Sequence, residues 1–312
     1  MRHEGTPVAP AQVGRATATR DTDPLGTHVR ATGRTPRWWV RFRGQPTGPA
    51  GLALLLPIAF AAIFATQLAP SDPLVGDGPA LRPPAAAHLL GTDDLGRDIL
   101  SGVLHGARVS LFVGATVALI STACGIVIGG VAGFFGGWVD DALMRLTELV
   151  QILPRFFLAI IIATFFGGSL FNIVLLLGLT FWPSTARLLR AQMLSLLERE
   201  FVVAARAIGA PPPRMLVRHV LPNALPAVIV NAALQVGGAI LVEAGLSFLG
   251  LGDSRYVSWG SMLNDAQPFF QLAWWMSIFP GLALLLTVVG VNLVADGFNE
   301  AWDPRLDEAA RR

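Results

Sequence analysis

The sequence contains no lysine, and this absence excludes one class of activity. All 23 of its Lys and Arg residues are arginines, in a chain of 312 residues. A nucleotide-binding P-loop of the form GxxxxGK[ST] needs a lysine that reaches the phosphates, and this chain cannot supply one. We therefore expect that the chain binds no ATP in this way, and that any ATP-driven work uses ATP held by another polypeptide.

Cysteine and charge are scarce as well. Cys124 is the single cysteine, so no intrachain disulfide can form, and the five histidines show no metal-ligand spacing. We expect neither a metal site nor catalytic residues. Only 14% of the residues are charged whereas 53% are hydrophobic. This balance is atypical of a soluble domain and indicates an integral membrane protein.

Six apolar runs are long enough to cross a bilayer, which takes about 20 residues in a helix. They lie near residues 50–69, 109–133, 149–167, 169–189, 224–250 and 273–297. The third and fourth runs are separated by two glycines, which predicts a tight hairpin. The sequence therefore predicts an all-α integral membrane protein with six transmembrane helices.

The arginines predict the orientation of these helices. Residues 1–48 are rich in Arg, Thr, Pro and Gly and are predicted to form a disordered tail rather than a secretory signal. If this tail is cytoplasmic, 19 arginines lie inside and four outside. Because cytoplasmic segments of membrane proteins are enriched in Lys and Arg, both the tail and the C-terminal residues 299–312 are expected in the cytoplasm.

The segment LGTDDLGRDILSGVLHGAR, residues 90–108, has an amphipathic pattern. We expect a helix that is capped by Thr92 or Asp93 and lies flat on the outer membrane surface, with Asp93 and Arg97 paired at i,i+4. With the first span it would form a unit over 49–107. The helix is either an interfacial anchor or a docking or gating surface; Asp93, Arg97 and Asp98 are the candidates for the second role.

Polar residues inside the predicted spans form two stripes. Asn292, Asp296 and Asn299 share one face of the last span, and Asn231 and Gln235 share a face of the fifth. Glu243 is the other acid in the fifth span. Such residues either line a water-filled path or form hydrogen bonds between neighbouring helices, and the pattern alone leaves both open.

A structured basic loop is predicted between the fourth and fifth spans. In VVAARAIGAPPPRMLVRHVLPN, residues 202–223, a helical apolar stripe ends at Gly209, which is a natural helix stop. The three prolines from Pro211 prevent that helix from continuing but suit the start of a second one. We therefore predict a helix, a forced turn and another helix on the cytoplasmic side.

This loop resembles the "EAA" loop of permease subunits of binding-protein-dependent ABC importers. The stretches LGTDDLGRDILSGVLHGARVSL, EAGLSFLGLG, SWGSMLNDA and PGLALLLTVVGVNLVADGFNEAWDPRL narrow the resemblance to the C-type subunit of dipeptide and oligopeptide importers, over about residues 50–306. One departure is Val203, which stands where the motif has its glutamate.

The resemblance implies a type I ABC importer permease fold, with a permease domain over 108–298 and a coupling loop at about 190–223. This loop would insert its short helix into a groove of an ATPase subunit. The residues that the resemblance assigns to this contact are Phe201, Val203, Ala204, Ala205, Ile208, Gly209, Leu221 and Pro222.

The resemblance also implies the partners and the location. These are a second homologous permease subunit, two ABC ATPases that carry ATP and Mg, an external solute-binding protein and the lipid of the inner (cytoplasmic) membrane; no nucleic acid is involved. Peptide import is the leading interpretation. Import of nickel, glutathione or another small solute by the same architecture is the alternative, and an ATP-independent secondary transporter or a non-transporting scaffold represents other classes.

Overall fold

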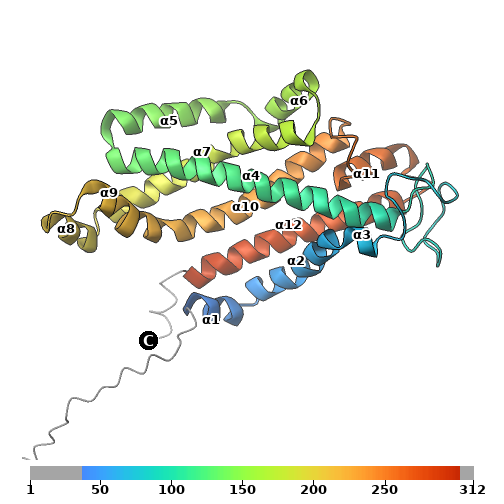
Figure 1. Ribbon diagram of the computed structural model, residues 1–312, viewed down its shortest axis with the longest axis horizontal. Helices are drawn as coiled ribbons and strands as arrows, with labels where there is room; N and C mark the ends of the chain where they lie inside the picture. Colours follow the sequence, from blue (N-terminus) through green and yellow to red (C-terminus); the bar gives the residue numbers. More distant parts are fainter. Residues whose placement is uncertain (1–36, 303–312) are drawn as a thin grey trace, which may run out of the picture. The chain divides into compact units, whose positions relative to one another are not determined.

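The computed structural model describes residues 37–302, and every regular element in this range is a helix (Figure 1). The α-helices are α1 Arg37–Gly44, α2 Thr47–Ile63, α3 Ala65–Leu68, α4 Ile99–Phe135, α5 Gly137–Ile152, α6 Arg155–Phe166, α7 Leu170–Leu197, α8 Glu200–Ala207, α9 Pro212–Met215, α10 Leu221–Phe248, α11 Trp259–Ala266 and α12 Trp275–Trp302. A π-helical turn, Leu216–Val220, joins α9 to α10, and a 3-10 turn, Gln267–Phe269, follows α11.

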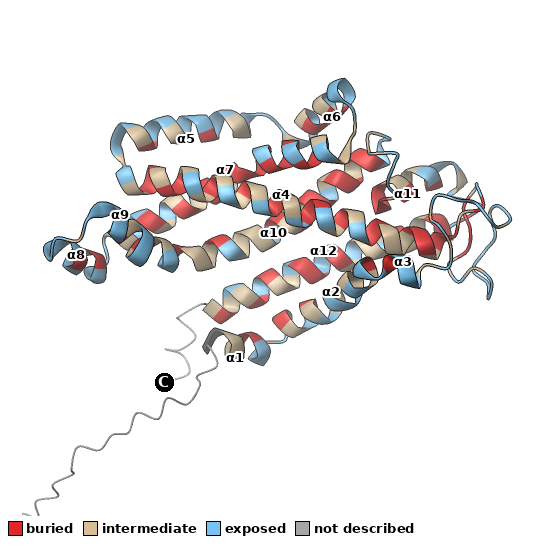
Figure 2. Ribbon diagram, in the orientation of Figure 1, coloured by how far each residue is buried: buried red, intermediate tan, exposed pale blue. Residues whose placement is uncertain are grey.

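Four helices are long and apolar enough to cross a membrane by length and composition. They are α4, α7, α12 and the continuous stretch Pro212–Phe248 that ends with α10. They lie alongside one another in Figure 1, and Figure 2 shows their buried residues on the sides that face each other. The structure thus confirms a helical membrane architecture.

Glycines allow α4 and α7 to pack closely. A Cβ added at Gly125 would lie 2.4 Å from Cβ of Thr185, and one added at Gly129 would lie 2.3 Å from the carbonyl oxygen of Ala186. No side chain fits at such distances without movement of the α7 backbone. Small residues of this kind let membrane helices approach closely, as α4 and α7 do at this interface.

The predicted span over 149–167 is not one continuous helix. The chain breaks between α5 and α6, whose axes differ by 73°. Pro154 has no N–H to donate and forces the residue before it out of the helical region; Leu153 is accordingly extended at φ −78°, ψ 123°. If the bent pair counts as one span, the described residues contain five candidates.

The tight turn after this pair is confirmed. α6 ends at Phe166, Gly167 adopts φ +83°, and α7 begins three residues later, with Ser169 as its N-cap. A left-handed conformation of this kind is natural only for glycine. Two consecutive helices therefore reverse direction within Gly167–Ser169.

The first helices also differ from expectation. The tail predicted to be disordered over 1–48 is helical from Arg37 onwards, and Phe42 of α1 is buried against Gly48 and Gly297. The apolar run 50–69 forms α2 and then α3, with Phe64 at the break between them. Residues 1–36 and 303–312, which include most of both predicted tails, lie outside the described residues.

Candidate functional site

The basic loop after α7 folds as a helix, a turn and a second helix, as the sequence predicted. α8 ends at Ala207, and Gly209 adopts φ +80°. The N–H of Ala210 donates to the carbonyl of Ala205 at 3.1 Å, and that of Gly209 donates to the carbonyl of Arg206 at 3.0 Å. This pair of bonds is a Schellman motif, which ends a helix and turns the chain.

The turn leads into α10 through an irregular segment. Pro211 precedes α9, and the π turn Leu216–Val220 follows before α10 begins at Leu221. The N–H of Leu221 donates five residues back, to Leu216. π turns widen a helix by one residue and occur often at functional sites. The second helix of the loop is thus continuous with the fifth apolar run.

α8 presents two different faces. Val202 and Ala205 are buried; Val202 is fully buried in a core cluster that includes Met193 and Met215. The opposite face is open to solvent, and Ile208 is 86% exposed. Phe201, Val203, Ala204 and Ala207 are exposed as well, beside the charged Glu200 and Arg206.

This arrangement corrects one prediction. Ala205 was expected in the contact stripe with Phe201, Ala204 and Ile208, but it packs against its own chain because it lies on the same side of the helix as Val202. Leu221 and Pro222 are half-buried and exposed, respectively, at the start of α10. The exposed apolar surface formed by Phe201, Val203, Ala204 and Ile208 is hereafter called the α8 surface.

Gln235 and Asn231 form hydrogen bonds between helices. The amide of Gln235 donates to Oγ1 of Thr185 at 2.6 Å and accepts from the hydroxyl of Ser121, while Asn231 donates to the same Thr185 oxygen at 2.9 Å. These bonds join α4, α7 and α10. For the buried Gln235, the geometry favours the second of the two alternatives, bonding of neighbouring helices.

Glu243 also points into the protein. Its side chain is 1% exposed, and Oε1 accepts a hydrogen bond from Ser247 at 2.7 Å. Its other oxygen has no hydrogen-bond partner among the described residues, and neither has the hydroxyl of Ser110 on α4. The acid is therefore enclosed between helices in this chain.

The polar stripe on α12 is exposed, unlike Gln235 and Glu243. Asn292, Asp296 and Asn299 are exposed, while Val291 and Ala295 beside them are buried. Three polar side chains on a long apolar helix thus face away from the packed side of this chain. Acyl chains are a poor environment for such groups, so this face suits water or another polypeptide.

The predicted helix over 90–108 does not exist as one element. Residues Thr92 and Asp98 pair across a closed turn, and α4 begins only at Ile99. Gly96 adopts φ +76°, and the carboxylate of Asp93 accepts from the N–H groups of Leu95 and Arg97 at 2.9 and 2.8 Å. Side-chain bonds of this kind compete with helix formation.

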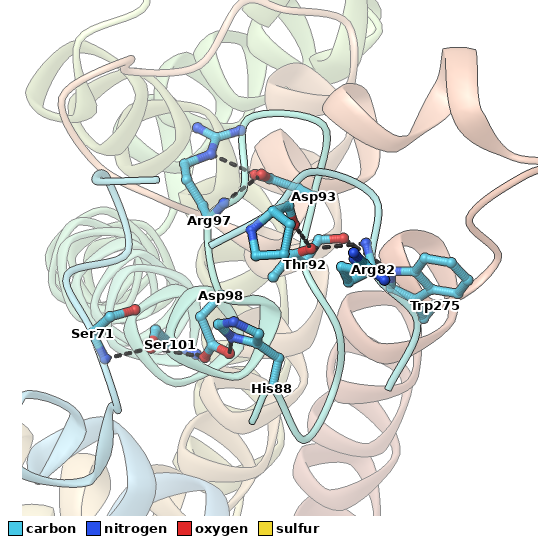
Figure 3. Close-up of polar contacts among 10 residues, drawn as sticks. Ser71, Arg82, His88, Thr92, Asp93, Arg97, Asp98, Ser101 and Trp275 are labelled. Carbon is cyan, nitrogen blue, oxygen red and sulfur yellow. Dashed lines mark hydrogen bonds and ion pairs between the residues drawn. The ribbon is translucent and has the colours of Figure 1, made fainter. Parts of the chain in front are cut away.

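The correct cap of α4 is Asp98, not Thr92 or Asp93. Its Oδ2 accepts from the N–H and the hydroxyl of Ser101 at 2.8 and 2.9 Å, and its Oδ1 lies 3.1 Å from Nδ1 of His88 (Figure 3). α4 then runs for 37 residues without interruption. The segment after residue 98 is therefore part of a candidate span, and it does not lie separately on the membrane surface.

The predicted Asp93–Arg97 pair is present, although it spans a turn rather than a helix (Figure 3). Arg97 also donates to Oδ2 of Asp265 on α11 at 2.9 Å. Burial acts against the charge of Arg97, but hydrogen bonds and fields from Asp93 and Asp265 raise its pKa. Nothing in the sequence indicated Asp265, because it lies 168 residues away.

These residues line a cavity of about 310 Å³ at the end of the bundle that carries α11. Asp93, Arg97, Asp98 and Asp265 line it together with Asp253 from the α10–α11 connection. The indole N–H of Trp275 holds the loop by donating to the carbonyl of Thr92 at 3.0 Å (Figure 3). The three residues proposed from the sequence thus lie close together.

No group of three or more His, Cys, Asp or Glu within residues 37–302 is arranged to hold a metal ion.

Comparison with known proteins places this geometry in a family. Residues 125–308 match the family described as "Binding-protein-dependent transport system inner membrane component". The di/tripeptide transport system permease protein DppC of Pseudomonas aeruginosa is 39% identical over 281 residues, covering 88% of this chain and 93% of that protein. The oligopeptide transport system permease protein OppC of Bacillus subtilis is 36% identical over 269 residues, covering 86% and 88%.

A solved structure shares the fold. The structure titled "Inward facing conformations of the MetNI methionine ABC transporter" superposes with a TM-score of 0.52 at 18% identity, covering 68% of this chain and 97% of that chain. The family model matches more than half of the sequence, and the two relatives match most of its length. Both comparisons agree with the resemblance seen in the loop. The chain belongs to the family of binding-protein-dependent transport system inner membrane components.

Proposed function

We propose that this protein is a permease subunit of an ATP-driven importer of dipeptides and oligopeptides. Relatives at 39% and 36% identity carry the names of di/tripeptide and oligopeptide permeases. The α8 surface is the structural observation that carries the proposal. An exposed apolar helix face at the end of a bundle suits a partner protein, and the Schellman turn at Gly209 holds that face in a fixed direction.

The α8 surface is proposed to dock into a groove of an ATPase subunit, with ATP and Mg bound by that subunit. Val203 is 52% exposed on this surface, where the family motif has an acid. The contact would therefore be apolar at this position. Arg206, Arg214 and Arg218 are exposed near it and would supply charge to the partner or to lipid headgroups.

The proposed topology has six spans with both termini in the cytoplasm. α2 has 17 residues, which gives it a length of ~25 Å; with α3 it covers the thickness of a bilayer core, about 30 Å. Together with the bent pair and the four long helices, this makes six. The excess of arginine at the α8 end supports a cytoplasmic location for that end in the inner membrane.

The full importer is proposed to contain a second homologous permease, two ATPases and an external solute-binding protein. The outer cavity with Asp93, Arg97 and Asp98 is the candidate docking or gating surface for the last of these. The exposed stripe of Asn292 and Asp296 is the candidate for the translocation path. Asn231, Gln235 and Glu243 are instead proposed to stabilise the bundle.

Reconstitution tests the proposal. The complete importer in proteoliposomes should take up a radiolabelled dipeptide only with ATP and the binding protein. Ile208→Glu places a charge in the α8 surface and should abolish ATP-dependent uptake while leaving membrane insertion intact. Val40→Glu is the matched control, because Val40 is also exposed, at 59%, but lies on α1. Uptake without any ATPase, or equal uptake by the Ile208→Glu protein, would contradict the proposal.

A further inference from the structure

Arg155 is a charged residue at the start of α6 to which the proposed function assigns no role. It is half-buried at the start of α6, and its guanidinium carbon lies 4.6 Å from the centroid of the Phe181 ring on α7. Phe181 is 11 residues beyond the first residue of α7, a distance of ~16 Å along the helix. Arg155 thus lies near half the depth of a bilayer core, which is about 30 Å thick.

No acid neutralises this charge within the described chain. None of the ion pairs or hydrogen bonds of residues 37–302 includes a carboxylate at Arg155, and its contact is the apolar ring. The charged side chain whose field reaches it is another cation, Arg187, which is exposed on α7. Arg155 therefore has no counter-charge among residues 37–302.

A cation at this depth is costly if it faces lipid. An arginine at the centre of a membrane helix costs about 2.5–3.5 kcal/mol on insertion scales, and such residues almost always face a bundle interior or a water-filled path. A lipid headgroup lies too far away to neutralise it at mid-depth. Arg155 is therefore expected to meet an anion that comes from outside the described residues.

We infer that Arg155 binds the C-terminal carboxylate of the transported peptide during its passage. This inference rests on the proposed function. Every linear peptide with a free C-terminus carries this carboxylate whatever its side chains are, so a fixed cation suits a path that accepts many sequences. The planar guanidinium of arginine matches the two oxygens of a carboxylate. The cation–π contact with Phe181 holds the guanidinium in place when the path is empty.

The test compares two forms of one peptide in the reconstituted importer. The substrates are trialanine with a free carboxylate and trialanine amide. Each is supplied at a concentration that saturates the binding protein, as measured by calorimetry. A difference in uptake then does not reflect the affinity of the binding protein for the two peptides. Arg155→Gln should lower uptake of the free acid by at least about tenfold, because the lost hydrogen bond is to a charged group, and it should change uptake of the amide little. Arg155→Lys should retain most of the uptake.

Two further variants separate binding from packing. Phe181→Leu removes the ring but keeps the cation, and it should preserve the preference for the free acid. Arg145→Gln is the matched control, since the Arg145 side chain is 83% exposed and pairs only with the exposed Glu148 at 3.7 Å.

The outcomes distinguish this inference from the proposed function. Equal losses for acid and amide in Arg155→Gln, as expected if Arg155 pairs with an acid of the second permease subunit, would overturn the inference. Unchanged uptake in that variant would overturn it too. If the unaltered importer takes up neither peptide with ATP, the proposed function itself fails.

Discussion

Replacement of Gly209 by alanine should separate coupling from folding. Gly209 has φ +80°, and a Cβ added there would meet no atom within 4 Å. The substitution therefore creates no clash, and its cost is the left-handed backbone conformation alone, about 1–2 kcal/mol. The loop is then in equilibrium between the α8 orientation seen here and rearranged orientations that avoid the strain. This cost would lower the ratio of the first to the second by about 5- to 30-fold.

The assay is the number of peptides transported per ATP hydrolysed in the reconstituted importer. If α8 transmits motion from an ATPase, this ratio should fall in Gly209→Ala by a factor in that range, while the yield of folded protein changes little. Gly167→Ala is the matched control: Gly167 has φ +83° and equally open surroundings, but it connects α6 to α7. It also carries backbone strain, because φ +83° with ψ 148° is a conformation that suits glycine alone, and it lies outside the loop.

The comparison of the two variants decides the result. The reasoning is refuted if Gly209→Ala transports as many peptides per ATP as the unaltered protein, or if Gly167→Ala reduces the ratio equally. The first result means that the orientation of α8 does not matter for coupling. The second means that any left-handed glycine has the same effect, so that the loop has no special role.

Three other expectations concern stability. Gln235→Leu leaves the hydroxyls of Ser121 and Thr185 without this partner. It should lower the free energy of unfolding, measured by SDS titration, by about 0.6–1.7 kcal/mol. An unchanged free energy of unfolding would mean that water replaces the amide. Asp98→Ala removes the cap of α4 and should cost about 0.5–2 kcal/mol in the same titration, whereas Asp72→Ala in the exposed loop before it should cost little. Hydrogen bonds from Arg255 lower the pKa of Asp253 from 3.8. The stability that this acid contributes is therefore complete above about pH 4 and is lost as the pH falls through the folded-state pKa. Melting temperatures measured from pH 7 downwards should show an acid-induced loss that Asp253→Asn lacks, and parallel curves would contradict this assignment.

Local patterns in the sequence predicted the shape of the loop between α7 and α10 well. The apolar stripe, Gly209 and the prolines act through bonds to residues a few positions away, so the helix, turn and second helix follow from them. The same local logic failed at residues 92–98. There the pattern fitted a helix, but Asp93 bonds its own backbone, and contacts with Pro79, Arg82 and Trp275 stabilise the turn instead.

Hydropathy located the apolar runs but not their geometry. A run of apolar residues has the same composition whether it is straight or bent, so the 73° break at Pro154 was missed. The arginine count likewise grouped Arg155 with the cytoplasmic loop. Only the packing of α6 against α7 places its guanidinium over Phe181, halfway along that helix.

The sequence by itself determined the helical membrane class, the missing P-loop lysine and the break in the loop at Gly209, because composition and short-range bonding decide these. The tertiary structure alone decided which way each polar side chain faces. Gln235 turns inward to partners on other helices and Glu243 turns inward to Ser247 of its own helix. Asn292 and Asp296 turn away from the packed side, and Arg97 meets Asp265 across 168 residues. A helical pattern fixes which residues share a face, but the neighbouring helices fix what that face contacts.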